Sequence, residues 1–134
     1  MDKEFNPDRL KIARLRRKMT YKELAASVKL TSKTISKYEN DGFNNPPSTE
    51  SLSKLAKVLR YPVQFFLEDN VDELPTEAVS FRALSKMTAA HRDAAISAGR
   101  LGFIVNDYIN RKFELPRQEF KDLRGIESEA AAEY

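Results

Sequence analysis

Two short helical segments joined by about three residues, within Thr20–Glu39, constrain the fold of this chain more than any other feature. Thr20 is a good N-cap residue and Glu23 follows it three positions later, which is the spacing of a capping box. Thr31 is suited to cap a second short helix. Ala25 has little bulk and allows the first helix to pack closely on the second. The segment therefore predicts a tight helix pair whose second helix exposes small polar and basic side chains.

Further helices are predicted on both sides of this pair. Asn6 and the following proline start a helix that is expected to run to about Lys18. Ser48 caps a fourth helix with an apolar stripe, and Pro62 starts a short fifth helix. Residues 1–70 are thus predicted to form one all-α domain of five helices.

Residues 71–134 are predicted to be a helical linker and oligomerisation region. Residues 68–79 are acidic and read as a linker, and a long helix follows from Thr88 to about Lys112. This helix is apolar over more than one face, so part of it needs cover from outside its own chain. We expect a homodimer, with a missing domain or a partner protein as the alternative cover. The predicted dimer seam consists of Leu101, Val105, Tyr108 and Ile109.

Charge and composition narrow the function classes. Between Arg9 and Lys37 there are ten basic residues and one acid, which is typical of a polyanion binder. The chain has no cysteine and a single histidine, His91, so no metal site is expected. No catalytic constellation or phosphate-binding loop is visible, so we expect neither an enzyme nor a cofactor. The N-terminus is charged and no apolar run approaches about 18 residues, so we expect a cytoplasmic protein without a membrane partner.

The segment around the helix pair resembles the Cro/phage-repressor type of helix-turn-helix, the Xre family, over about residues 8–68. The resemblance rests on Thr20, Glu23-Leu24-Ala25, Thr34-Ile35-Ser36, Glu39 and Gly42, followed by the helix of Leu52, Leu55 and Ala56. It implies a lambda-repressor-like fold. It also implies that the second helix of the pair enters the major groove of double-stranded DNA.

The resemblance assigns roles to particular residues. Ser32, Lys33 and Lys37 match positions that contact base edges. Thr34 and Ser36 match flanking positions that reach phosphate or base. Tyr21 lies where the family often has a glutamine that contacts the DNA backbone, with partial packing as the alternative. The whole predicted DNA-binding set is Tyr21, Lys22, Ser32, Lys33, Thr34, Ser36 and Lys37.

Two further positions are interpreted through the same resemblance. Arg14 and Glu39 match an ion pair that joins the first and third helices. Lys29 occupies the turn position where the family prefers glycine, so a left-handed backbone there would be disfavoured but tolerable for lysine.

A second resemblance covers Val79–Pro116, which looks like the segment joining an Xre domain to an ImmA/IrrE-type metallopeptidase. The zinc-binding HExxH motif of that peptidase is absent, so the chain is either the N-terminal part of a longer protein or a short regulator. The main prediction is a sequence-specific DNA-binding transcriptional regulator, expected to repress its own or a neighbouring operon. The alternatives are an antitoxin-like module with a neighbour-encoded protein partner, and the sensor part of a peptidase fusion.

Overall fold

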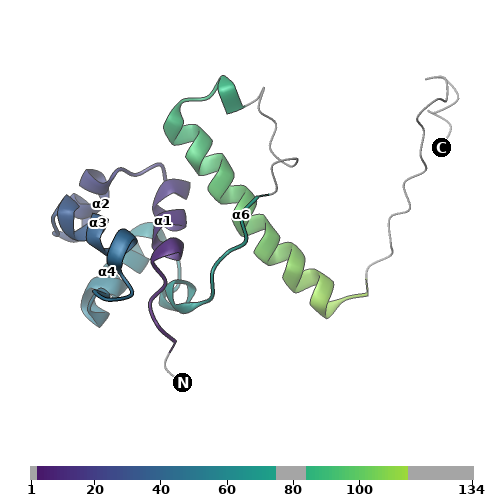
Figure 1. The fold of residues 1–134 in the computed structure, drawn as a ribbon, viewed down its shortest axis with the longest axis horizontal. Helices are drawn as coiled ribbons and strands as arrows, with labels where there is room; N and C mark the ends of the chain where they lie inside the picture. Colours follow the sequence, from purple (N-terminus) through teal and green to yellow (C-terminus); the bar gives the residue numbers. More distant parts are fainter. Residues whose placement is uncertain (1–2, 75–83, 115–134) are drawn as a thin grey trace, which may run out of the picture.

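The computed structural model describes residues 3–74 and 84–114, and every element within these ranges is a helix (Figure 1). The elements are α1 (Pro7–Arg16), α2 (Tyr21–Val28), α3 (Ser32–Asp41), α4 (Thr49–Leu59), the 3-10 helix η1 (Val63–Leu67) and α6 (Ala89–Lys112). The all-α prediction is therefore confirmed. No helix in the described part of the chain has the length and apolar character needed to cross a membrane.

The helices begin where their capping residues predict. Each N-cap side chain accepts a hydrogen bond from a backbone N–H in the first turn, which satisfies a donor that the helix itself cannot pair. These N-caps are Asn6, Thr20, Thr31, Ser48 and Thr88. The ends differ slightly from prediction. α1 stops at Arg16 because Lys18 turns into the left-handed region at φ 57°. α3 runs to Asp41, one residue past the expected end at Asn40.

One hydrophobic core joins α1 to α4 and η1. Its residues come from every one of these elements, and η1 closes it with Phe66, which is fully buried. The buried members are Phe5, Leu10, Ala13, Leu24, Ala25, Val28, Ile35, Leu52, Leu55, Ala56, Leu59 and Phe66. This core fixes α2 and α3 against α1.

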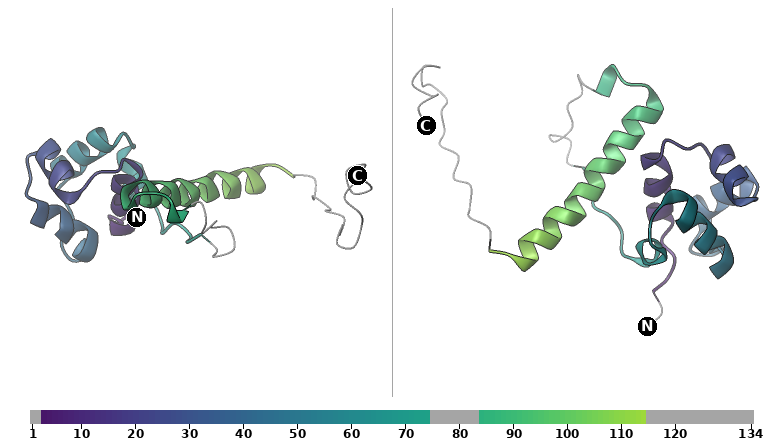
Figure 2. Two further views of the ribbon diagram at one scale, coloured as in Figure 1. Left: turned by 90° about the horizontal axis from the view of Figure 1, so that it is seen from above. Right: turned by 180° about the vertical axis from the view of Figure 1, so that it is seen from behind.

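α1 also has a second buried face, which lies against α6 (Figures 1 and 2). Ile12 is only 1% exposed although it is not part of the main core. It lies one helical turn after Asp8, and Arg100 of α6 forms an ion pair with Asp8. Buried Ala94 lies on the α6 side. α1 is thus covered on one side by α3 and on the other by α6.

The first part of the expected linker, residues 68–72, is packed against the domain. These residues run along α1 and are held there by hydrogen bonds to their backbone carbonyl oxygens. Arg9 Nε donates to Asp69 O at 2.7 Å, and Asn6 Nδ2 donates to Glu68 O at 2.9 Å. Val71 is only 5% exposed. The acidic composition gave no sign of this packing, because the packing depends on partners about 60 residues earlier in the chain. The remainder of the expected linker, from residue 75 to 79, lies outside the described residues.

Candidate nucleic-acid interface

The turn between α2 and α3 is fixed by local backbone contacts. Lys29 ends α2 in the left-handed region, at φ 57° and ψ 41°, as the glycine preference of the resembled family suggested. The N–H of Leu30 donates to Ala25 O at 2.9 Å. Thr31 Oγ1 then accepts from the N–H of Thr34 at 3.1 Å and starts α3. The lysine tolerates a conformation that glycine adopts more easily, and the turn sets the angle of the two helices.

The start of α2 is held by a complete capping box. The N–H of Thr20 donates to Glu23 Oε2 at 2.7 Å, and the N–H of Glu23 donates to Thr20 Oγ1 at 3.2 Å. The backbone N–H and the hydroxyl of Thr20 both donate to the carboxylate, which lowers the pKa of Glu23 below its usual value. Lys22 lies exposed within this first turn.

The outer face of α3 carries three of the predicted reading residues. Ser32, Lys33 and Lys37 are exposed, while Ile35 and Glu39 on the inner face are buried. Lys33 and Lys37 are four residues apart, so their side chains lie above one another on the helix surface. Neither lysine forms an ion pair with any residue in ranges 3–74 and 84–114. Both ammonium groups are thus free for an outside partner.

The two flanking hydroxyl residues are placed differently. Thr34 and Ser36 are half-buried, and each hydroxyl already has a partner within the chain. Thr34 Oγ1 lies 2.8 Å from Thr31 Oγ1, and Asn40 Nδ2 donates to Ser36 Oγ at 3.1 Å. A hydroxyl can both donate and accept, so these contacts orient the two groups without exhausting them.

A groove of about 420 Å³ runs beside α3. Its lining residues come from α3 and the loop that follows, and they are Thr31, Lys33, Thr34, Lys37, Tyr38, Asn45 and Pro46. The loop keeps its shape because the Asp41 carboxylate accepts from Asn44 Nδ2 at 2.7 Å and from Asn45 Nδ2 at 2.5 Å. The groove therefore has two cationic side chains on one wall and a fixed loop on the other.

Arg14 and Glu39 join α1 to α3 from behind the exposed face. Arg14 Nε donates to Glu39 Oε1 at 2.6 Å and Nη2 donates to Oε2 at 2.8 Å, with side chains that are 8% and 1% exposed. Arg14 Nη1 also donates to Met19 O at 2.8 Å. Burial would lower the pKa of Arg14, but the hydrogen bond and the charge of Glu39 outweigh it and raise the pKa. The arginine thus stays charged in the interior.

Tyr21 packs against this ion pair. Its ring is half-buried at the edge of the core, and the Arg14 guanidinium lies 4.3 Å from the ring centroid. The ring therefore has the packing role that was the alternative to DNA contact. A contact between the Tyr21 hydroxyl and DNA stays a prediction.

Three of the ten basic residues between Arg9 and Lys37 serve the fold. Arg9 bonds to Asp69 O, Arg14 pairs with Glu39, and Arg17 Nε donates to Leu59 O at 2.8 Å. The guanidiniums of Arg9 and Arg17 also lie over aromatic rings. The other seven are exposed and form no ion pair within the described ranges: Lys11, Arg16, Lys18, Lys22, Lys29, Lys33 and Lys37. Sequence alone overstated the number of free cations.

Comparison with known protein families agrees with this geometry. The part of the chain from α1 to η1, residues 10–66, matches a family model described as helix-turn-helix. These residues are therefore similar to a helix-turn-helix domain. The match supports the Xre-type resemblance of this part and, in general terms, the prediction of a DNA-binding transcriptional regulator. No curated protein and no solved structure matches the chain.

The second half of the chain is not covered by that match. The matched region ends at residue 66, so it gives no support to the resemblance between Val79–Pro116 and the linker of ImmA/IrrE-type fusions. His91 is exposed in the first turn of α6, and its Nδ1 lies 2.6 Å from Thr88 Oγ1. Within ranges 3–74 and 84–114, no three side chains of the metal-binding types come together.

Proposed function

We propose that this chain represses transcription by binding as a homodimer to two half-sites of an operator, in its own or a neighbouring operon. The observation that carries the proposal is the outer face of α3, where exposed Lys33 and Lys37 stand one turn apart beside a groove. Buried Ile35 and the Arg14–Glu39 pair support that face from behind. A helix with free donors on a rigid support can enter the major groove and read base edges.

The exposed cations supply the affinity that does not depend on sequence. Lysine and arginine side chains that neutralise phosphates release counterions, so binding weakens as salt rises. Phosphate contacts position a protein on the duplex, and base contacts give it specificity. Occupied operator DNA then excludes the polymerase, which is a steric mechanism and needs no catalytic group.

The second copy is proposed because α6 is much longer than the helix that covers it. α1 has ten residues and α6 has 24, which correspond to lengths of about 15 Å and about 36 Å. α6 therefore extends well past α1 (Figure 2). Its apolar stripe continues over this extension at helical spacing from Ala94 through Leu101 to Tyr108.

The exposed end of this stripe contains most of the predicted seam. Val105 and Tyr108 are each 59% exposed, and Leu101 and Ile109 are half-buried. A single helix-turn-helix reads few bases, and a second copy doubles the readable site. A stripe that starts in the contact with α1 and continues uncovered is best completed by the same stripe of another copy.

The DNA part of the proposal is tested by selecting bound sequences from a random duplex pool. We expect a two-part consensus with at least one G·C pair in each half, because lysine donates to guanine O6 and N7. Lys33→Ala should weaken binding by about 1–3 kcal/mol and relax one position of the consensus. Lys86→Ala removes an equal charge from an exposed site outside the domain and serves as the control. Equal effects of the two variants would contradict base reading by α3.

The homodimer is tested by light scattering on the full chain at tens of micromolar. We expect twice the chain mass, and Val105→Asp should give monomers because it places a charge in the seam. Asn110→Asp makes the same change in charge on the opposite side of α6 and should stay dimeric. A wild-type monomer would assign the stripe to another protein, as in the antitoxin-like alternative.

A further inference from the structure

We propose that Arg100 is a positioning residue that fixes the direction of α6 on the helix-turn-helix domain and thereby sets the spacing between two DNA half-sites. The proposal rests on the proposed function for its DNA part. Arg100 lies in the half of α6 that covers α1, and the seam begins at the next residue, Leu101. One helix thus carries both the attachment to the DNA-binding domain and the contact to the second copy.

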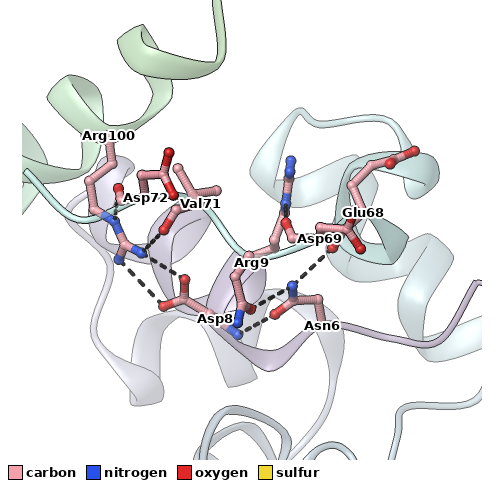
Figure 3. Close-up of polar contacts among 9 residues, drawn as sticks. Asn6, Asp8, Arg9, Glu68, Asp69, Val71, Asp72 and Arg100 are labelled. Atoms are coloured by element: carbon pink, nitrogen blue, oxygen red, sulfur yellow. Dashed lines mark hydrogen bonds and ion pairs between the residues drawn. The ribbon is translucent and has the colours of Figure 1, made fainter. Parts of the chain in front are cut away.

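Arg100 joins α6 to two other segments through all three nitrogens of its guanidinium (Figure 3). Nη2 donates to Asp8 Oδ2 at 2.8 Å and Nη1 to Asp8 Oδ1 at 3.4 Å. Nη2 also donates to Val71 O at 2.5 Å, and Nε donates to Asp72 O at 3.2 Å. The side chain is 17% exposed. Fork-shaped pairing of this kind restricts direction as well as distance.

The groups that receive Arg100 are themselves held in place. Asp8 lies in the first turn of α1, where its N–H donates to Asn6 Oδ1 at 3.0 Å. Asn6 Nδ2 donates to Glu68 O at 2.9 Å (Figure 3). Asn6 Nδ2 also donates to Asn70 Oδ1 at 2.9 Å, and Asn6 N donates to Phe66 O at 2.7 Å. The N-terminus of α1 and residues 66–72 therefore form one rigid seat for the guanidinium.

The buried side chains that α6 itself contributes are small. Ala94 and Ser97 are the buried residues of α6, and neither has the shape to prevent sliding or rotation. Gly99 brings α6 close to Leu74, since a Cβ there would lie 2.9 Å from a Leu74 methyl carbon. Apolar contact of this kind has no preferred direction. The Arg100 cluster supplies the direction.

The seat is also connected to α3, the helix that is proposed to read DNA bases. Asp8 and Arg14 lie on the same ten-residue helix, and Arg14 forms the buried pair with Glu39 of α3. A rotation of α6 on α1 is therefore a rotation of the seam relative to α3. In a dimer, that angle determines how far apart the two copies of α3 lie. DNA half-sites must match it, because their phase changes with each base pair of spacer.

The first experiment measures the attachment itself, without DNA. The chain has no cysteine, so spin labels can be placed at Ala26→Cys in α2 and Asn110→Cys in α6, both exposed sites. We expect one narrow distance distribution within each chain when labelled chains are diluted with unlabelled ones. Arg100→Ala should broaden it, and so should Arg100→Lys, which keeps the charge and loses the fork. An unchanged width in both variants would overturn the proposal.

The control uses another arginine of the same helix. Arg111 pairs with Asp107 at 2.7 Å within α6, and both side chains are largely exposed. Arg111→Ala removes an ion pair from α6 and none of the hydrogen bonds of the seat, so the distance distribution should stay narrow. Broadening as large as that of Arg100→Ala would show that any loss of charge loosens α6, which contradicts a specific seat.

The second experiment measures spacing. Duplexes with two half-sites should bind best in phase, and shifting one site by about 5 bp places it on the opposite side of the DNA. We expect wild-type chain to prefer the in-phase duplex about 100-fold or more, the size of a two-site effect. Arg100→Ala should reduce this preference to less than about tenfold with single half-site affinity unchanged within about twofold.

Each alternative predicts a different result in these two experiments. If Arg100→Ala keeps the full spacing preference of the wild-type chain, the proposal is overturned. It is also overturned if the variant loses single half-site affinity by as large a factor as it loses spacing preference, because that would indicate a general structural role. If wild-type chain fails to bind DNA, the proposed function fails, and the label distances still decide whether Arg100 fixes α6.

Discussion

Gly42 follows α3 at a point where no side chain fits. A Cβ built there would lie 2.2 Å from Tyr38 O, 2.7 Å from Phe5 Cε1 and 2.8 Å from Pro7 Cγ. Its φ of −66° suits any residue, so space and not backbone freedom requires the glycine. Gly42→Ala should lower the free energy of unfolding by about 1–3 kcal/mol, measured by denaturant titration.

Gly102 in α6 has nothing within 4 Å of its Cβ position, so Gly102→Ala should instead stabilise α6 by about 0.5–1 kcal/mol. Equal destabilisation would contradict the steric reading.

The pair of Arg14 and Glu39 should behave as a buried unit. Glu39→Ala leaves the guanidinium charged and without its partner, so the free energy of unfolding should fall by about 3–5 kcal/mol. Changing both residues to apolar ones of similar volume should recover most of that loss, because no buried charge remains. Glu50→Ala breaks the exposed pair with Lys54 and should leave the free energy of unfolding almost unchanged in the same titration. A double variant as unstable as Glu39→Ala would argue against the buried charge as the cause.

The sequence predicted some residue roles and missed others for a physical reason. Lys33 and Lys37 lie on an amphipathic helix, so their exposure follows from local periodicity. The contacts of Arg9, Arg17 and Arg100 do not follow from it, because each guanidinium donates to backbone carbonyl oxygens that lie 28 to 60 residues away in sequence. A carbonyl acceptor leaves no trace in residue type, and an arginine is read as a surface charge unless its partner is known.

At the scale of elements, α2 depends on its capping box, which makes its stability sensitive to pH. The folded-state pKa of Glu23 is lowered from the usual 4.5, first by the Thr20 backbone N–H and then by its hydroxyl. A lowered carboxylate pKa contributes stability that is fully present above about pH 4.5 and is lost as pH falls through the folded value. Thermal unfolding midpoints should therefore fall between about pH 5 and about pH 3, and less steeply in Glu23→Gln. Glu4→Gln, an exposed carboxylate outside the helices, is the control. If the midpoint falls with pH as steeply in Glu23→Gln as in the wild-type chain, the capping box is not the cause of the pH dependence.

Element starts were more predictable than element ends or the segments between elements. Capping acts within about three residues, so Thr20, Thr31 and Thr88 could be identified from sequence alone. The 3-10 geometry of η1 and the course of residues 68–72 are decided by tertiary packing. Val71 is buried and its carbonyl oxygen accepts from Arg100 Nη2 of α6, and an acidic segment gives no local sign of that contact.

At the scale of the whole molecule, α1 packs on two sides, against the main core on one and against α6 on the other. The main core holds α1 to α4 and η1 together without α6, whereas Ile12 is buried outside that core, and we infer that α6 covers it. A chain ending at residue 74 should therefore fold and bind a single half-site. This is also the test of the predicted domain division near residue 70.

Ile12 reports whether α6 is the layer that covers it. In the full chain, Ile12→Ala should lower the free energy of unfolding by about 2–5 kcal/mol, as expected for a fully buried isoleucine. In the chain ending at residue 74 the side chain faces solvent, so the same substitution should cost less than about 0.5 kcal/mol, the range of surface changes. Leu10→Ala is the matched control, because Leu10 faces the main core and should cost the same in both chains. Both costs come from denaturant titration. If Ile12→Ala is as costly in the shorter chain as in the full one, the cover comes from within residues 1–74, and α6 would be free to move on α1.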